Sequence, residues 1–90
     1  MQKSFNQTLH IRILSPQQLI LDTQAQSVTS KNTQGNFDIL PLHANFITVI
    51  ENVPIVIHTL EGKRLSFAFP FAIIFTSNNQ VNIYTQIQYK

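Results

Sequence analysis

The segment IVIHTLEGKRLSFAF, residues 55–69, decides the fold class of this chain. Isoleucine, valine, threonine and phenylalanine, which favour strands, lie on both sides of Glu61-Gly62-Lys63. A short loop with a glycine between two such runs is typical of a β-hairpin. We therefore expect residues 55–60 to pair with residues 64–69.

The same alternation of short β-rich runs and polar turns extends along the whole sequence. A second hairpin is expected across Ser77-Asn78-Asn79-Gln80. Turn signals about every ten residues are typical of an antiparallel sandwich or barrel. We predict an all-β fold in a single domain, residues 1–90. Further strands are expected at residues 8–14, 19–23, 27–30, 46–50, 73–76 and 81–85, with one more after Gly35.

One segment, SFAFPFAIIF at residues 66–75, has two contrasting faces if it is extended. Pro70 has no N–H for a strand ladder, so we expect an edge strand or a bulge there. Two interpretations remain open: a strand buried on both faces, or a small-residue face that docks a partner. The two sets are Phe67, Phe69 and Phe71 on the face expected in the core, and Ala68, Pro70 and Ala72 on the other.

The composition excludes several classes of protein. Charged residues make up only 11% of the chain, and the net charge is +2. Asn and Gln occupy about a fifth of the positions, so the surface depends little on charge repulsion, as a surface with a permanent partner can. The few basic residues are dispersed, which argues against nucleic acid binding. We expect a soluble chain with no membrane span and no signal peptide, which reaches a membrane only through its partners.

No catalytic, cofactor or metal site emerges from the sequence. There is no cysteine, and the three histidines lie on three different segments without metal-like spacing. The four acids form no close pair, and Glu51 and Glu61 fall at turns, where solvated acids belong. We therefore expect a non-enzymatic protein without a cofactor.

The central segment TQGNFDILPLHANF, residues 33–46, carries the most specific pattern. Gly35 permits a tight turn, and Pro41 fixes the exit of the following strand. Loops that a rigid scaffold holds often carry function. The physical chemistry of the residues alone goes no further than this.

This segment resembles the epsilon subunit of F-type ATP synthases, which is called delta in mitochondria. The family pattern is roughly G-T-E-G-E-F-G-I-L-P-G-H-A-P-L-L. The flanks agree in spacing, from Ser15-Pro16 near the start to the turn before Val81 near the end. The positions that match the central pattern are Thr33, Gly35, Phe37, Ile39, Leu40, Pro41, His43 and Ala44.

The resemblance implies an antiparallel β-sandwich of about ten short strands in the rotor of an ATP synthase. Such a domain couples ion-driven rotation of the c-ring to the gamma subunit at the cytoplasmic face of the bacterial inner membrane, and it has no active site. The c-ring contact maps to Gln34, Gly35, Asn36, Phe37 and Asp38. The gamma contact maps to His43 and Ala44, with Ala68, Pro70 and Ala72 as the candidate docking face.

Several departures from the family pattern affect these expectations. Gln34 and Asn36 replace two acids, which weakens charge attraction to the c-ring, and Asp38 restores one negative charge. Leu42 replaces a glycine, and a left-handed backbone there is costly for leucine. The sequence ends before the helical hairpin of typical epsilon subunits, so we expect coupling without inhibition by that hairpin.

Two other functions remain as alternatives. A small nucleic-acid-binding barrel would use Phe67, Phe69 and Phe71 as stacking rings, although basic residues do not cluster around them. An accessory sandwich of an unrelated complex is compatible with the same strand pattern.

Overall fold

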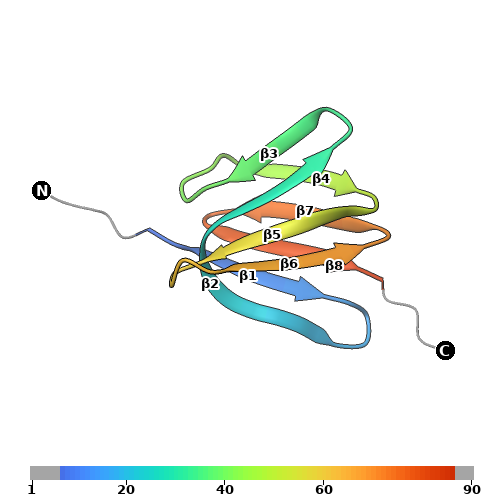
Figure 1. Ribbon diagram of the computed structural model, residues 1–90, viewed down its shortest axis with the longest axis horizontal. Coiled ribbons are helices and arrows are strands. Elements are labelled where there is room, and N and C mark those ends of the chain that lie inside the picture. Colours follow the sequence, from blue (N-terminus) through green and yellow to red (C-terminus); the bar gives the residue numbers. More distant parts are fainter. Residues whose placement is uncertain (1–6, 87–90) are drawn as a thin grey trace, which may run out of the picture.

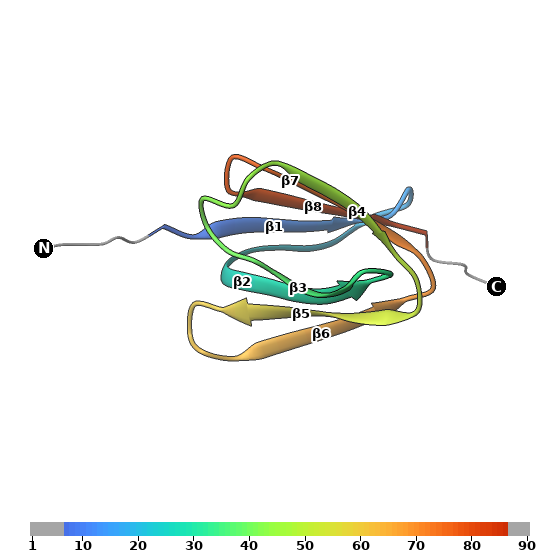
Figure 2. The same ribbon diagram turned by 90° about the horizontal axis from the view of Figure 1, so that it is seen from above.

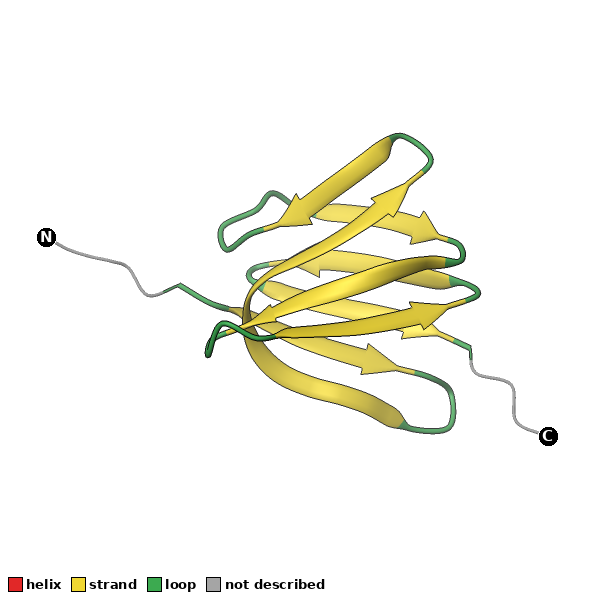
Figure 3. Ribbon diagram, in the orientation of Figure 1, coloured by secondary structure: helices red, strands yellow, loops and turns green. Residues whose placement is uncertain are grey.

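The computed structural model describes residues 7–86, which form eight strands joined by turns (Figure 1). No helix occurs among these residues (Figure 3). The predicted all-β class and both predicted hairpins are confirmed. The strands are β1 (Leu9–Leu14), β2 (Leu19–Asn32), β3 (Gly35–Ile39), β4 (Phe46–Ile50), β5 (Val53–Thr59), β6 (Arg64–Phe69), β7 (Ala72–Ser77) and β8 (Gln80–Thr85).

The expected count of about ten strands was too high. Residues 19–23 and 27–30, predicted as separate strands, belong to the single 14-residue strand β2. The sequence between them, Gln24-Ala25-Gln26, has no glycine or proline to end the pairing. β2 instead continues through this segment, and its pairing with β5 shifts in register between Ala25 and Ser27. Such a bulge bends a strand without ending it.

The strands form one curled sheet in the order β4-β7-β8-β1-β2-β5-β6, with β3 paired to β2. Seen from above, β4, β7, β8 and β1 form one layer, and β2, β3, β5 and β6 form the other (Figure 2). The pairs are antiparallel except for β1 and β8, which run parallel. The expectation of a purely antiparallel sandwich was therefore wrong for that one pair.

The core between the layers is almost entirely aliphatic. Alternate residues of each strand point inward, which gives patterns such as buried–intermediate–buried along β1 and β5. Half-buried aromatic side chains, including Phe37 and Phe46, pack against its margin. The fully enclosed side chains are Leu9, Ile11, Ile13, Ala25, Val28, Ile39, Ile55, Ile57, Ala72, Ile74, Val81 and Ile83.

The phenylalanine-rich segment is arranged differently from the prediction. Phe69 is buried and stacks on the half-buried Phe67, with ring centroids 6.2 Å apart. β6 ends there, as an edge strand next to Pro70, so the alternation does not continue into β7. Phe71 lies in the turn and is exposed, whereas Ala72 is completely buried. Ala72 therefore shares no surface with Ala68 and Pro70, contrary to the prediction.

Two isoleucines in adjacent strands of one layer differ in burial. Truncating them to alanine should therefore lower the free energy of unfolding by unequal amounts. Ile74→Ala empties a fully buried site, so we expect the free energy of unfolding to fall by about 2–5 kcal/mol. Ile47→Ala removes a side chain that is 66% exposed and should cost about 1 kcal/mol or less. Urea denaturation followed by circular dichroism measures both. Equal losses for the two variants would contradict the inward and outward assignment of β4 and β7.

Candidate interaction surface

The outer side of one layer exposes a continuous set of apolar side chains. We call it the apolar face: Ile47 and Val49 of β4, Ile73 and Phe75 of β7, and Tyr84 of β8. Strand register makes them neighbours, since Ile47 lies opposite Phe75, Val49 opposite Ile73, and Ile73 opposite Tyr84. All are exposed except Ile73, which is half-buried. Contiguous exposed apolar groups of this kind mark interaction sites.

The same layer becomes polar as it continues onto β1 and into β2. Asn82 of β8 lies beside Arg12 of β1, which in turn lies opposite Asp22. Asp22 contacts His10 Nε2 at 2.5 Å and Arg12 Nε at 3.6 Å. The apolar face thus has one polar border, which resembles the polar rim around the apolar centre of a protein interface.

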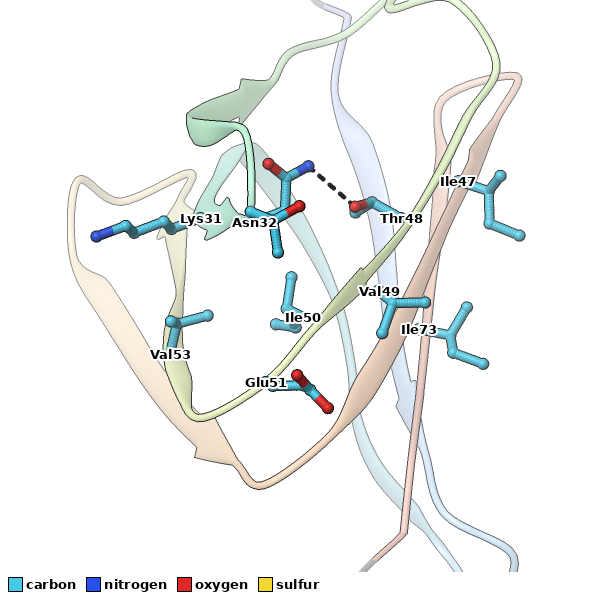
Figure 4. Close-up of a pocket in the computed structure, with 10 residues that line it drawn as sticks. Lys31, Asn32, Ile47, Thr48, Val49, Ile50, Glu51, Val53 and Ile73 are labelled. Atoms are coloured by element: carbon cyan, nitrogen blue, oxygen red, sulfur yellow. Dashed lines mark hydrogen bonds between the residues drawn. The ribbon is translucent and has the colours of Figure 1, made fainter.

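A groove of about 770 Å³ runs beside β4, which is the terminal strand of the sheet path. Figure 4 shows the side chains that line it, which include Ile47, Val49 and Ile73 of the apolar face. Lys31 and Glu51 give it charges of opposite sign. The groove therefore extends the apolar face around an edge strand that a neighbouring protein can cover.

Asn32 connects this groove to the turn between β2 and β3. Its Nδ2 donates to Thr48 Oγ1 of β4 at 3.0 Å (Figure 4). Its Oδ1 accepts from the backbone N–H of Gln34 at 2.9 Å, an Asx-type turn bond. One side chain thus holds both the turn and the edge strand.

Of the five residues predicted to contact a c-ring, three are exposed, whereas Gly35 shapes the turn and Phe37 packs inward. We call residues 34–38, which are the last residue of the β2–β3 turn and the first four residues of β3, the polar loop; Gln34, Asn36 and Asp38 are exposed on it. Gly35 has a φ of +124°, which fits the predicted tight turn. Phe37 turns inward, with its ring 5.4 Å from that of Phe46, so its main contacts are within the domain.

Asp38 is held in place by the neighbouring strands. Thr29 Oγ1 donates to Asp38 Oδ1 at 2.6 Å, and His58 Nε2 lies 3.1 Å from the same hydroxyl. Because the hydroxyl hydrogen goes to the carboxylate, the imidazole nitrogen is the donor in the second contact. Among residues 7–86 no group of three or more His, Cys, Asp or Glu is placed to hold a metal ion.

The residues predicted to contact gamma do not converge. His43 and Ala44 are exposed in the loop between β3 and β4, where the His43 ring packs edge-on against Phe46 at 5.7 Å. Ala68 and Pro70 are exposed at the other end of β4, beside Asn52, whose N–H bonds the Pro70 carbonyl at 3.2 Å. With Ala72 buried, the predicted Ala/Pro face is reduced to two residues.

The sequence reasoning missed the apolar face, although a signal was present. The runs FITVI and AIIF have apolar residues at adjacent positions and not only at alternate ones. For the segment at residues 66–75, which contains AIIF, burial on both sides was one of the two interpretations, and this is the usual meaning of such a run in a covered sheet. FITVI was interpreted only as a strand. In a two-layer fold, each strand of a layer has only one side against the other layer, so the second apolar side is left on the outside.

Comparison with known proteins agrees with this architecture. The family described as ATP synthase, delta/epsilon chain, β-sandwich domain matches residues 8–89. This chain belongs to that family. The ATP synthase epsilon chain of Nitratiruptor sp. is 32% identical over 73 residues, which are 81% of this chain and 57% of the relative. That of Desulfitobacterium hafniense is 32% identical over 76 residues, 84% of this chain and 57% of the relative.

Solved structures share the fold. A chain of the Euglena gracilis mitochondrial ATP synthase OSCP/F1/c-ring structure superposes with a TM-score of 0.82, covering 91% of this chain and 52% of that one, at 13% identity. A chain of the Tetrahymena thermophila mitochondrial ATP synthase central stalk and c-ring structure gives 0.74, with 97% and 69% covered, also at 13% identity. The chain spans 57% of the length of each of these two epsilon chains. No helix within residues 7–86 has the length and apolar character needed to cross a membrane.

The double role of Asn32 yields a prediction for local stability. Asn32→Ala removes two hydrogen bonds, so we expect a loss of about 1–2 kcal/mol and faster amide exchange in β4 and residues 33–36. Hydrogen exchange followed by NMR measures both. Asn36→Ala changes an exposed asparagine of β3 just after the same turn; it is the control and should leave β4 unchanged. Unaltered exchange of β4 in Asn32→Ala would contradict this role.

Proposed function

We propose that this domain is a non-catalytic coupling element of an F-type ATP synthase rotor, which docks the gamma subunit on its apolar face and meets the c-ring through the polar loop. It would act at the cytoplasmic face of a bacterial inner membrane, attached through the complex. The observation that carries the proposal is the apolar face, on a chain of the delta/epsilon family.

The apolar face favours a permanent partner. Ile47, Val49 and Phe75 are 66%, 47% and 41% exposed in the domain alone, which leaves aliphatic and aromatic surface in water. Obligate interfaces are more apolar than transient ones, because their surfaces are never displayed alone. His43 and Ala44, at one end of β4, lie beside this surface and remain gamma contacts in the proposal. Ala68 and Pro70, at the other end, form a separate and smaller candidate contact.

The polar loop suits a second partner with exposed polar loops of its own. Gln34 and Asn36 offer amide donors and acceptors, and Asp38 supplies one negative charge. Asn32 attaches this loop to β4, which carries Ile47 and Val49 of the apolar face. A force received at the loop is therefore delivered to the gamma-binding side through a direct hydrogen-bonded connection rather than through a flexible linker.

The nucleic-acid alternative is weakened by the side-chain directions. Phe67 and Phe69 pack toward the core and stack on each other, so they offer no platform for bases. Only Phe71 of the three is exposed. Base stacking of the kind seen in single-strand binders needs accessible ring faces beside a basic groove.

The docking proposal predicts the effect of one buried charge. Val49→Lys places an ammonium group on the apolar face opposite Ile73, so binding to the gamma subunit encoded in the same genome should weaken about 100-fold or more. Isothermal titration calorimetry measures the dissociation constant. Glu61→Lys introduces the same side chain at the exposed tip of the β5–β6 hairpin and should bind like the unmodified chain. Binding that is indifferent to Val49→Lys, or absent from the unmodified chain, would refute docking on this face.

The c-ring contact is tested separately. The double variant Gln34→Lys/Asn36→Lys replaces two exposed neutral side chains and leaves Gly35 and Phe37, which the turn and the core need. We expect ATP-driven ion pumping by the assembled complex in vesicles to fall at least about twofold through repulsion from basic c-ring loops. Gamma binding should not change. Gln34→Glu/Asn36→Glu is the matched control with opposite charge; equal pumping in both would remove the polar loop from the c-ring contact.

A further inference from the structure

Leu42 has a backbone conformation that leucine rarely adopts. Residues 40–43 form a turn closed by a bond from His43 N to Leu40 O at 3.1 Å, with Pro41 second and Leu42 third, at a φ of +67°. A turn with proline second and positive φ third is of type II, in which the third position favours glycine or asparagine. The other three non-glycine residues with positive φ in residues 7–86 are all asparagines. Leu42 therefore has the left-handed backbone conformation that the sequence analysis predicted to be costly for leucine.

The same leucine is 76% exposed, more than any other large apolar side chain in the described residues. It thus combines backbone strain with almost complete exposure to water, and neither property stabilises the domain. Residues held in strained conformations cluster at functional sites, where the surrounding structure imposes them. Leu42 is therefore a candidate for a role outside the fold.

The surrounding structure does impose this conformation. The Leu42 N–H donates to Asn79 Oδ1 at 2.6 Å. Asn79 is itself fixed, because its carbonyl accepts from His10 N at 2.9 Å and its Nδ2 donates to Gln7 Oε1 at 3.1 Å. The turn after β3 is thus attached to the β7–β8 turn and to the start of β1 (Figure 1). Leu42 is held in one place before any partner arrives.

Two neighbouring hollows connect Leu42 to the apolar face. A hollow of about 370 Å³ beside Leu42 and His43 shares Asn78 with a second hollow, of about 410 Å³, that reaches Phe75. The surface between Leu42 and the apolar face is lined with amides, including Asn45 and Asn79. An apolar side chain surrounded by hydrogen-bonding groups has the layout of an interface anchor with its polar surroundings.

We propose that Leu42 is a preorganised apolar anchor, which inserts into an apolar pocket of the same protein that covers the apolar face. This inference rests on the proposed function, in which that protein is the gamma subunit. Holding the anchor in its bound conformation in advance removes part of the ordering cost of association. The strain at Leu42 is retained because glycine, which would relieve it, would leave the partner's pocket empty.

The test separates folding from binding with variants of one residue. Leu42→Gly relieves the backbone strain and removes the side chain, whereas Leu42→Ala removes the side chain alone and Leu42→Met keeps an apolar chain of similar length. We expect the melting temperature of Leu42→Gly to equal or exceed that of the unmodified chain. Its affinity for the gamma subunit, and that of Leu42→Ala, should fall about 30-fold or more, as for a truncated hot spot. Leu42→Met should bind within about fivefold of the unmodified chain.

Leu60→Ala is the matched control, since Leu60 is another exposed leucine, located in the β5–β6 hairpin. It should leave the affinity unchanged. If the unmodified chain binds gamma and Val49→Lys does not, but Leu42→Gly binds normally, the anchor is overturned while the proposed function stands. If the unmodified chain fails to bind gamma, both are overturned. A lower melting temperature for Leu42→Gly would show that the side chain serves the fold, and this also overturns the anchor.

Discussion

The structure depends on the pairing of β1 with two partners at once. β1 lies parallel to β8 on one side and antiparallel to β2 on the other, and it is the central strand of the sheet path. Its inward residues Leu9, Ile11 and Ile13 have no solvent exposure. Without this strand, the hairpins of β7–β8 and β5–β6 belong to two unconnected sheets. Burial of three large aliphatic side chains, each contributing about 1.5–3 kcal/mol, holds the layers together.

The two-layer arrangement explains where interaction surfaces can arise. Each layer has one covered side, and the sheet path ends at β4 and β6, which leaves free edges. Exposed edge strands pair readily with other chains, so proteins protect or cover them. At β4 the edge carries the apolar groove and the bond from Asn32 to Thr48, which joins it to the polar loop. The exposed apolar groove and the link to the polar loop therefore lie at the same edge of the sheet.

Local sequence patterns predicted the strands well. The alternation of apolar and polar residues, the β-branched residues and the turn residues each determine the backbone conformation of only a few neighbouring positions. Gly62 and the pair Asn78-Asn79 both have positive φ, as their hairpin turns require. The parallel β1–β8 pair joins residues about 70 apart in sequence, and no local pattern encodes such a contact. Proline at position 70 was interpreted as a bulge or an edge, and the real break there reversed the burial expected for Phe71 and Ala72.

The candidate site was less predictable than the fold, for a physical reason. Ile47 and Val49 are suitable strand formers in either a core or an exposed face, so their identity does not reveal which side they take. The polar loop and Leu42 carry stronger signals, since a turn must satisfy backbone geometry as well as burial. A small domain has little stability to spare, yet this one keeps a strained leucine and an uncovered apolar face. Neither feature stabilises the domain by itself, and the proposed docking accounts for both, because a partner would cover the apolar face and receive the Leu42 side chain.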